Sequence, residues 1–116
     1  MWLSYDPEGD VLEVVFEETL HDTAEQAAFE LRDGIVIYTT PDVLKLIQLT
    51  LVSYRALAQF PVIHFDGWDK LSKSEKALLS PILQSPAISA FLRIDPKTGH
   101  GHIVNSDMLE ILPLAA

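Results

Sequence analysis

One run of residues, 43–52, limits the fold of this chain more than any other. Written as an extended strand, it carries apolar side chains on both sides, and only Lys45, Gln48 and Thr50 interrupt it. A strand of this kind is typical of the inside of a sheet that is covered on both faces. We therefore expect a strand over 43–52, covered by later residues of the chain or by a second copy. The two apolar groups are Val43, Ile47, Leu49 and Leu51 on one side and Leu44, Leu46 and Val52 on the other.

A first hairpin is predicted before this run. Residues 11–16 alternate apolar and other side chains with a period of two, which indicates a strand. The preceding Asp6-Pro7-Glu8-Gly9 has the composition of a turn, in which Gly9 is expected to take a positive φ. Residues 2–5 can then pair back with the strand.

A second hairpin is indicated by Asp33-Gly34, which separates an alternating segment, 27–32, from the β-branched segment 35–40. Between the hairpins, residues 17–26 read as a polar loop with a helical turn from Asp22 or Thr23.

The second half of the chain is less regular. We expect a helix near 53–59, capped by Ser53 and stopped by Pro61, and another from Ser72 or Ser74, with Leu71, Leu78 and Ile82 at helical spacing. Further expectations are a short strand at 62–65, a turn at 66–69, a helix becoming a strand over 87–94, a returning strand at 101–104 and a helical turn at 106–110.

These elements predict an α+β fold, in which an antiparallel β-meander is followed by short helices and a C-terminal hairpin. The length of 116 residues fits a single domain with its own core. Residues 1–60 would form the meander and a helix, and residues 61–116 would pack on it.

The net charge of −9 is unevenly distributed. Residues 1–42 hold eleven Asp or Glu and one base, Arg32, whereas residues 43–116 hold six acids and seven bases. An acidic front half repels phosphate groups, so no nucleic-acid partner is expected. The acidic residues fit either the solvated face of a sheet or a surface for a basic partner protein.

Several classes of protein are not expected from the composition. The chain has no cysteine, which excludes disulfides and thiolate chemistry. The first residues lack the basic and apolar regions of a signal peptide, and no apolar run is long enough for a membrane span. We expect a cytoplasmic protein with no membrane partner and no cofactor.

The first sixty residues resemble the domain of unknown function 2283. The resemblance rests on residues 5–14, Tyr-Asp-Pro-Glu-Gly-Asp-Val-Leu-Glu-Val, on Gly34-Ile35-Val36-Ile37-Tyr38 and on residues 46–54. The chain departs from that family at 39–42 and at 46–48. The resemblance implies a small β-meander with a helix and implies no activity.

Two groups of residues are candidates for metal binding. Asp6, Glu8, Asp10 and Glu17 have the spacing of oxygen ligands in a calcium loop, but Val11 stands where glycine is required. The second group, His64, Asp66, His100 and His102, could hold zinc and an attacking water. Ordinary turn and surface residues are the default explanation of both groups, and the serine and nucleotide-binding motifs of common enzymes are missing.

The sequence therefore favours a non-enzymatic protein that acts through protein–protein contacts as a homodimer. Trp68, Lys45, Ile47 and Leu49 are the predicted contact residues. The alternative is a metal-assisted hydrolase that uses the second group of candidates.

Overall fold

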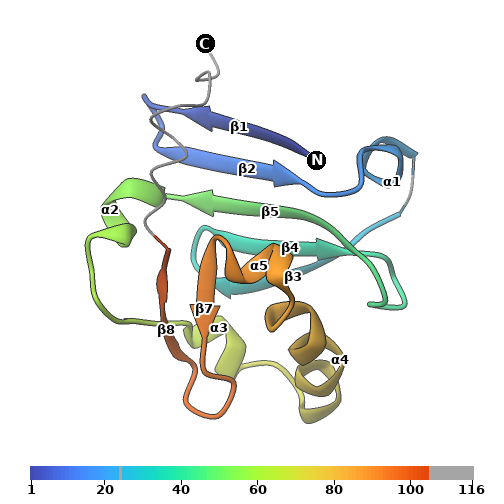
Figure 1. The fold of residues 1–116 in the computed structure, drawn as a ribbon. Helices are drawn as coiled ribbons and strands as arrows, with labels where there is room; N and C mark the ends of the chain where they lie inside the picture. The colour runs from blue at the N-terminus through green and yellow to red at the C-terminus, as the bar shows by residue number, and fades with distance from the viewer. Residues whose placement is uncertain (24, 105–116) are drawn as a thin grey trace.

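Five strands between residues 2 and 52 form the larger of two sheets in the computed structural model, which describes residues 1–23 and 25–104. Every pairing in this sheet is antiparallel, and the strand order is β1-β2-β5-β4-β3 (Figure 1). The predicted meander is thus confirmed, and β5 returns to lie between the two hairpins. The strands are β1 (Trp2–Asp6), β2 (Val11–Val15), β3 (Ala27–Arg32), β4 (Ile35–Thr39) and β5 (Leu46–Val52).

The central strand β5 is shorter than predicted and is fully buried on one face only. Ile47, Leu49 and Leu51 are at most 1% exposed. On the other face Gln48 and Thr50 are half-buried, and Val52 is 38% exposed. Polar side chains on this face keep contact with solvent, so the described residues of the chain do not themselves cover both faces of β5.

Residues 40–45 form a turn instead of the start of β5. The Asp42 carboxylate accepts hydrogen bonds from the Thr40 hydroxyl and the Leu44 backbone N–H, which lowers the pKa of Asp42. Leu44 is 76% exposed as a result. The register between β4 and β5 shifts at this end and sets Leu46 opposite the buried Thr39, so that Leu46 packs against the core.

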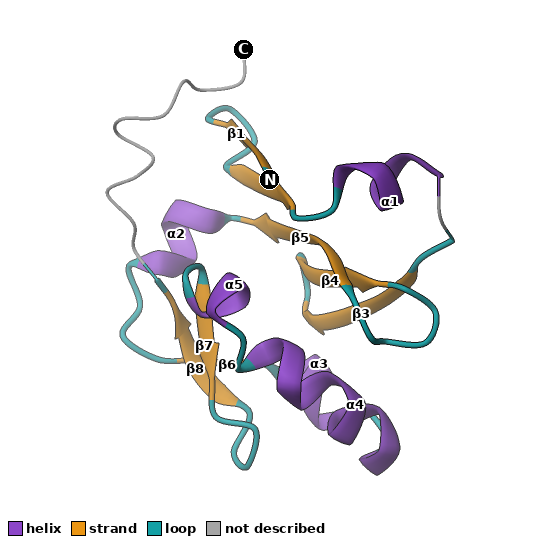
Figure 2. Cartoon of the chain, turned by 45° about the vertical axis from the view of Figure 1, so that its right-hand side comes forward, coloured by secondary structure: helices purple, strands orange, loops and turns teal. Residues whose placement is uncertain are grey.

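The second half of the chain forms a layer over the buried face of the large sheet (Figure 2). A small sheet of order β6-β8-β7 and four helices make up this layer, while α1 (Glu18–Thr23) joins β2 to β3. The layer consists of α2 (Tyr54–Ala58), β6 (Ile63–His64), α3 (Asp66–Asp69), α4 (Lys73–Leu83), α5 (Pro86–Ser89), β7 (Leu92–Ile94) and β8 (His100–Ile103).

Several predictions for the second half agree with this layer. The helix that becomes a strand corresponds to α5 and β7, and the returning strand is β8. Residues 66–69 form the short helix α3 instead of a turn, and the helical turn predicted at 106–110 lies outside the described residues. No helix among residues 1–23 and 25–104 is long and apolar enough to cross a membrane.

Helix α4 begins where the sequence indicated. The Ser72 hydroxyl accepts from the backbone N–H of Glu75, and the Glu75 carboxylate accepts from the backbone N–H of Ser72, which lowers the pKa of Glu75. Leu79 rather than Leu78 faces the core, since Leu78 is 50% exposed. Pro81 lies inside the helix, whose last residue is Leu83.

One carboxylate joins the first hairpin to α2. Asp10 takes the positive φ that was expected of Gly9, at 54°, in the turn between β1 and β2. Its carboxylate accepts from the Tyr5 hydroxyl at 2.7 Å and from the backbone N–H groups of Arg55 at 2.9 Å and Ala56 at 3.2 Å.

Asp10 therefore satisfies the first amides of α2, the role predicted for Ser53. Ser53 itself has a left-handed backbone and makes no side-chain capping bond. Burial alone would raise the pKa of Asp10, but the hydrogen bonds from Arg55, Tyr5 and Ala56 outweigh it and lower this pKa. Burial, together with the bond to Asp10, raises the pKa of Tyr5 to about 12.

Replacing Asp10 with Asn should destabilise the fold in a pH-dependent way. Asn tolerates a positive φ and keeps one acceptor oxygen but loses the charge, so the free energy of unfolding at neutral pH should fall by about 1 kcal/mol. Because the pKa of Asp10 is lowered by folding, its charged form adds stability above the unfolded pKa of about 3.9. The difference between wild type and variant should shrink as the pH falls through the folded pKa.

Urea denaturation between neutral and acid pH measures this difference. Glu8→Gln is the matched control, since Glu8 lies in the same turn and is exposed, and its effect should stay within about 0.5 kcal/mol at every pH. A pH-independent difference for Asp10→Asn would contradict the assigned role of the charge.

Candidate interaction surface

The two edges of the large sheet differ in their protection. At β3, the backbone of α3 packs directly on the backbone of the strand, and a Cβ on Gly67 would overlap the carbonyl oxygen of Glu30. Arg32 adds a hydrogen bond of 2.8 Å to the carbonyl oxygen of His64. No further strand can pair with this part of β3 while α3 is in place.

The other edge strand, β1, has no described element on its outer side (Figure 1). Its sequence, Trp-Leu-Ser-Tyr-Asp, contains no lysine, arginine or proline, the residues that commonly block an edge strand. Met1 and Trp2 are 73% and 48% exposed. An apolar edge with free backbone groups is a template for pairing with another strand.

The face of the large sheet that turns away from the second layer is called the open face here. The cross-strand register aligns the residues of this face in two rows that run across the five strands. The first row is Trp2, Val15, Gln48, Tyr38 and Ala28, and the second row is Ser4, Glu13, Thr50, Val36 and Glu30. In Figure 2 the helices α2 to α5 and the small sheet all lie on the other side of the large sheet.

The open face is mixed in polarity and acidic. The charged residues in these two rows are Glu13 and Glu30, and Glu30 also lines a surface hollow with Arg32 and Lys70. Trp2 is exposed and Tyr38 is half-buried, so aromatic and aliphatic side chains surround the carboxylates. Such a surface repels a second copy of itself and attracts basic groups.

Three of the four predicted contact residues lie inside the core. Ile47 and Leu49 are 0% exposed, and Trp68 is 1% exposed with its indole N–H donating to the carbonyl oxygen of Pro96 at 2.9 Å. Only Lys45 is exposed, in the turn before β5. Buried side chains cannot contact a partner, and Trp68 and Leu49 instead belong to the core cluster that joins the two layers of the chain.

The predicted histidine group is only partly assembled. His64 and His100 face each other on β6 and β8, and their rings stack with centroids 4.6 Å apart. The carboxylate beside them belongs to Asp69, whose Oδ2 lies 2.5 Å from His64 Nε2, and not to the predicted Asp66. Asp66 lines a separate surface hollow with Arg32.

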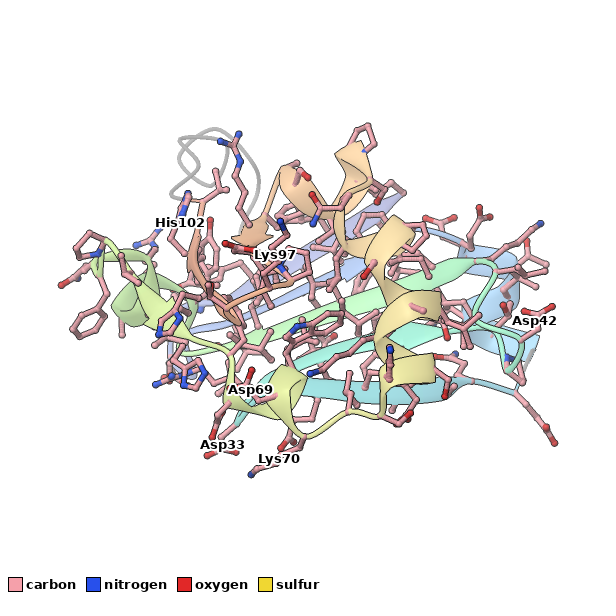
Figure 3. All side chains as sticks on the ribbon, turned by 90° about the horizontal axis from the view of Figure 1, so that it is seen from below. Asp33, Asp42, Asp69, Lys70, Lys97 and His102 are labelled. Atoms are coloured by element: carbon pink, nitrogen blue, oxygen red, sulfur yellow. The ribbon has the colours of Figure 1, made fainter. Side chains whose placement is uncertain are left out.

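His102 does not complete a metal site with this pair. It lies opposite Arg93 of β7, and Figure 3 shows His102 and Asp69 well apart on different elements. Within residues 1–23 and 25–104 no three His, Asp or Glu side chains come close enough to hold a metal ion. The stacked pair is therefore an exposed polar contact of the small sheet.

The candidate calcium ligands also diverge. Asp6 accepts from the backbone N–H of Glu8 at 3.0 Å, and Asp10 caps α2. Glu17 lies beyond the far end of β2, separated from the turn by an extended strand. The carboxylates of Asp6 and Asp10 thus serve the turn and its connection to α2.

Comparison of the chain with protein families, with curated proteins and with solved structures gives no match. The resemblance to the domain of unknown function 2283 therefore stays a prediction. The structure gives a physical account of the residues that carry it, because Tyr5 and Asp10 are joined by a hydrogen bond that ties the hairpin to α2.

The core position of Trp68 leads to a stability prediction. Trp68→Ala removes a fully buried side chain and should lower the free energy of unfolding by about 3–5 kcal/mol. Phe60→Ala is the control on an exposed aromatic, since Phe60 is 56% exposed and its loss should cost less than about 0.5 kcal/mol. Denaturant unfolding of both variants measures the contrast, and equal effects would contradict the assignment of Trp68 to the core.

Proposed function

We propose that this protein is a non-enzymatic interaction module that acts as a homodimer through the outer edge of β1. The observation that carries the proposal is the unequal protection of the two sheet edges. One edge is covered by α3, whereas β1 presents an apolar strand that no described element covers. Soluble proteins rarely leave such an edge without a partner.

A two-fold axis through the middle of β1 would satisfy this edge. Antiparallel pairing of β1 with its copy, centred on Ser4, sets Trp2 against Asp6 of the copy and joins the two sheets into one. The contact is isologous, so it closes at two copies and does not extend into a fibre. Leu3 and Tyr5, which face the core side in each copy, become neighbours across the axis.

Stacking of two open faces is a less favourable way to form the dimer. It would bring together the two aligned rows of each copy, which contain Glu13 and Glu30 and no lysine or arginine. Like charges at an interface oppose association. Edge pairing keeps both open faces in solvent.

A lysine at position 4 should dissociate the dimer without unfolding the chain. In the two-fold pairing the two Ser4→Lys side chains stand opposite each other and repel. Within each chain the new lysine lies opposite Glu13, an acidic neighbour that favours the folded strand. Light scattering coupled to size exclusion should give twice the chain mass for wild type and the single-chain mass for the variant.

Ala28→Lys is the matched control for this experiment. Ala28 lies exposed on the same face but on β3, next to the covered edge, and the substitution adds the same charge. This variant should remain dimeric. A wild-type protein that stays monomeric at micromolar concentrations, or equal dissociation by both variants, would refute the proposal.

A further inference from the structure

A pocket lies on the open face where α1 meets β1 and β2. It has a volume of about 300 Å³ and is lined by Trp2, Val15, Glu18, His21 and Asp22. Val15 is 3% exposed, whereas the Trp2 side chain is 48% exposed. The pocket thus combines a buried aliphatic residue, an accessible indole and two carboxylates from α1.

The chemistry of these side chains selects a cation. An indole attracts a guanidinium or ammonium group placed over its ring, and a guanidinium also donates paired hydrogen bonds to carboxylates. Glu18 and Asp22 are both exposed, and the described residues that line the pocket include no lysine or arginine to neutralise them. His21 is held beside Asp22, with 3.3 Å between its Nδ1 and the carboxylate Oδ1.

We infer that this pocket binds an arginine side chain from a basic segment of a partner protein that lies along the open face. The volume is at the small end of ligand pockets and suits one side chain. Two of the lining residues, Trp2 and Val15, also belong to a row of the open face, so the pocket continues into a surface that carries Glu13 and Glu30. Further basic residues of the same segment would meet these carboxylates.

The inference goes beyond the proposed dimer and does not depend on it. The described lining residues of the pocket all belong to one chain, so the pocket forms in a monomer. Dimerisation is tested by the mass of the protein in solution, whereas the pocket is tested by peptide binding. One of the two proposals can therefore fail without the other.

The probe is an acetylated and amidated heptapeptide of alternating arginine and serine, added to the full-length protein. The readout is the indole N–H resonance of Trp2 in a nitrogen–proton correlation spectrum, assigned with Trp2→Phe. Trp68 is the internal reference, because its indole is buried and bonded to Pro96. The Trp2 signal should shift and saturate while the Trp68 signal stays in place.

Two double variants separate the pocket from general charge attraction. The double variant Glu18→Gln with Asp22→Asn should weaken binding of the peptide about tenfold or more. This is the effect expected for the loss of charge-assisted hydrogen bonds worth at least about 1.4 kcal/mol. Glu8→Gln with Asp33→Asn changes the net charge equally at exposed positions outside the pocket and should have a clearly smaller effect. Equal weakening by both would overturn the inference.

Two further probes test the cation and its source. The same peptide with citrulline in place of arginine should fail to shift Trp2, and binding of this neutral peptide would overturn the inference. N-acetylarginine amide alone should bind more weakly than the peptide. If the single amino acid bound equally tightly, the ligand would be a small molecule and the partner segment would be refuted.

Discussion

The burial of a single face of β5 is the constraint on which the rest of the structure depends. Leu49 and Leu51 are buried in the core cluster that the large sheet shares with the second layer. That layer could not stand alone, since β6 has two residues and β7 has three. Each half of the chain therefore supplies the apolar surface that the other half needs. The buried residues of both halves form one core cluster, as expected of a single cooperative domain.

The same arrangement determines which surfaces remain for partners. Trp68 of α3 is buried in the core, and the backbone of α3 packs against the backbone of β3. The helix therefore covers that edge of the sheet. The opposite edge, β1, has no described element on its outer side, and main-chain pairing at such an edge would depend little on the partner's sequence. The open face adds a selective surface, because Glu13, Glu30 and the pocket beside Trp2 favour positive charge. In the two proposals above, the edge of β1 would serve self-association and the open face would bind a basic segment.

The conformation of the first hairpin depends on residues near the turn and also on a segment far along the chain. Turn chemistry located the turn between β1 and β2 but assigned the positive φ to Gly9 instead of Asp10. The reason lies 45 residues further on, where the Arg55 amide at the start of α2 needs an acceptor. A left-handed Asp10 can aim its carboxylate there and also accept from Tyr5. No window of sequence around the turn contains that requirement.

The candidate sites show a similar limit. Trp68, Ile47 and Leu49 were chosen for apolar character, which serves a core as well as an interface, and the structure places them in the core. His64 was paired with Asp66 by spacing, but the helical turn of α3 brings Asp69 to it instead. The pocket beside Trp2 is lined by residues of β1, β2 and α1, and the sequence indicated only the acidic excess of residues 1–42, which fitted a surface for a basic partner.

By itself, the sequence determined the elements whose causes are local. The alternation of apolar and polar residues predicts the strands, Asp33-Gly34 predicts a hairpin, and Ser72 with Glu75 marks the start of α4. Each of these signals acts within a few residues. Only the tertiary structure decided which face of β5 is covered, which edge of the sheet is closed and which carboxylates meet an aromatic ring. Those outcomes depend on contacts between segments far apart in the chain, and periodicity describes a strand's faces without saying what will cover them.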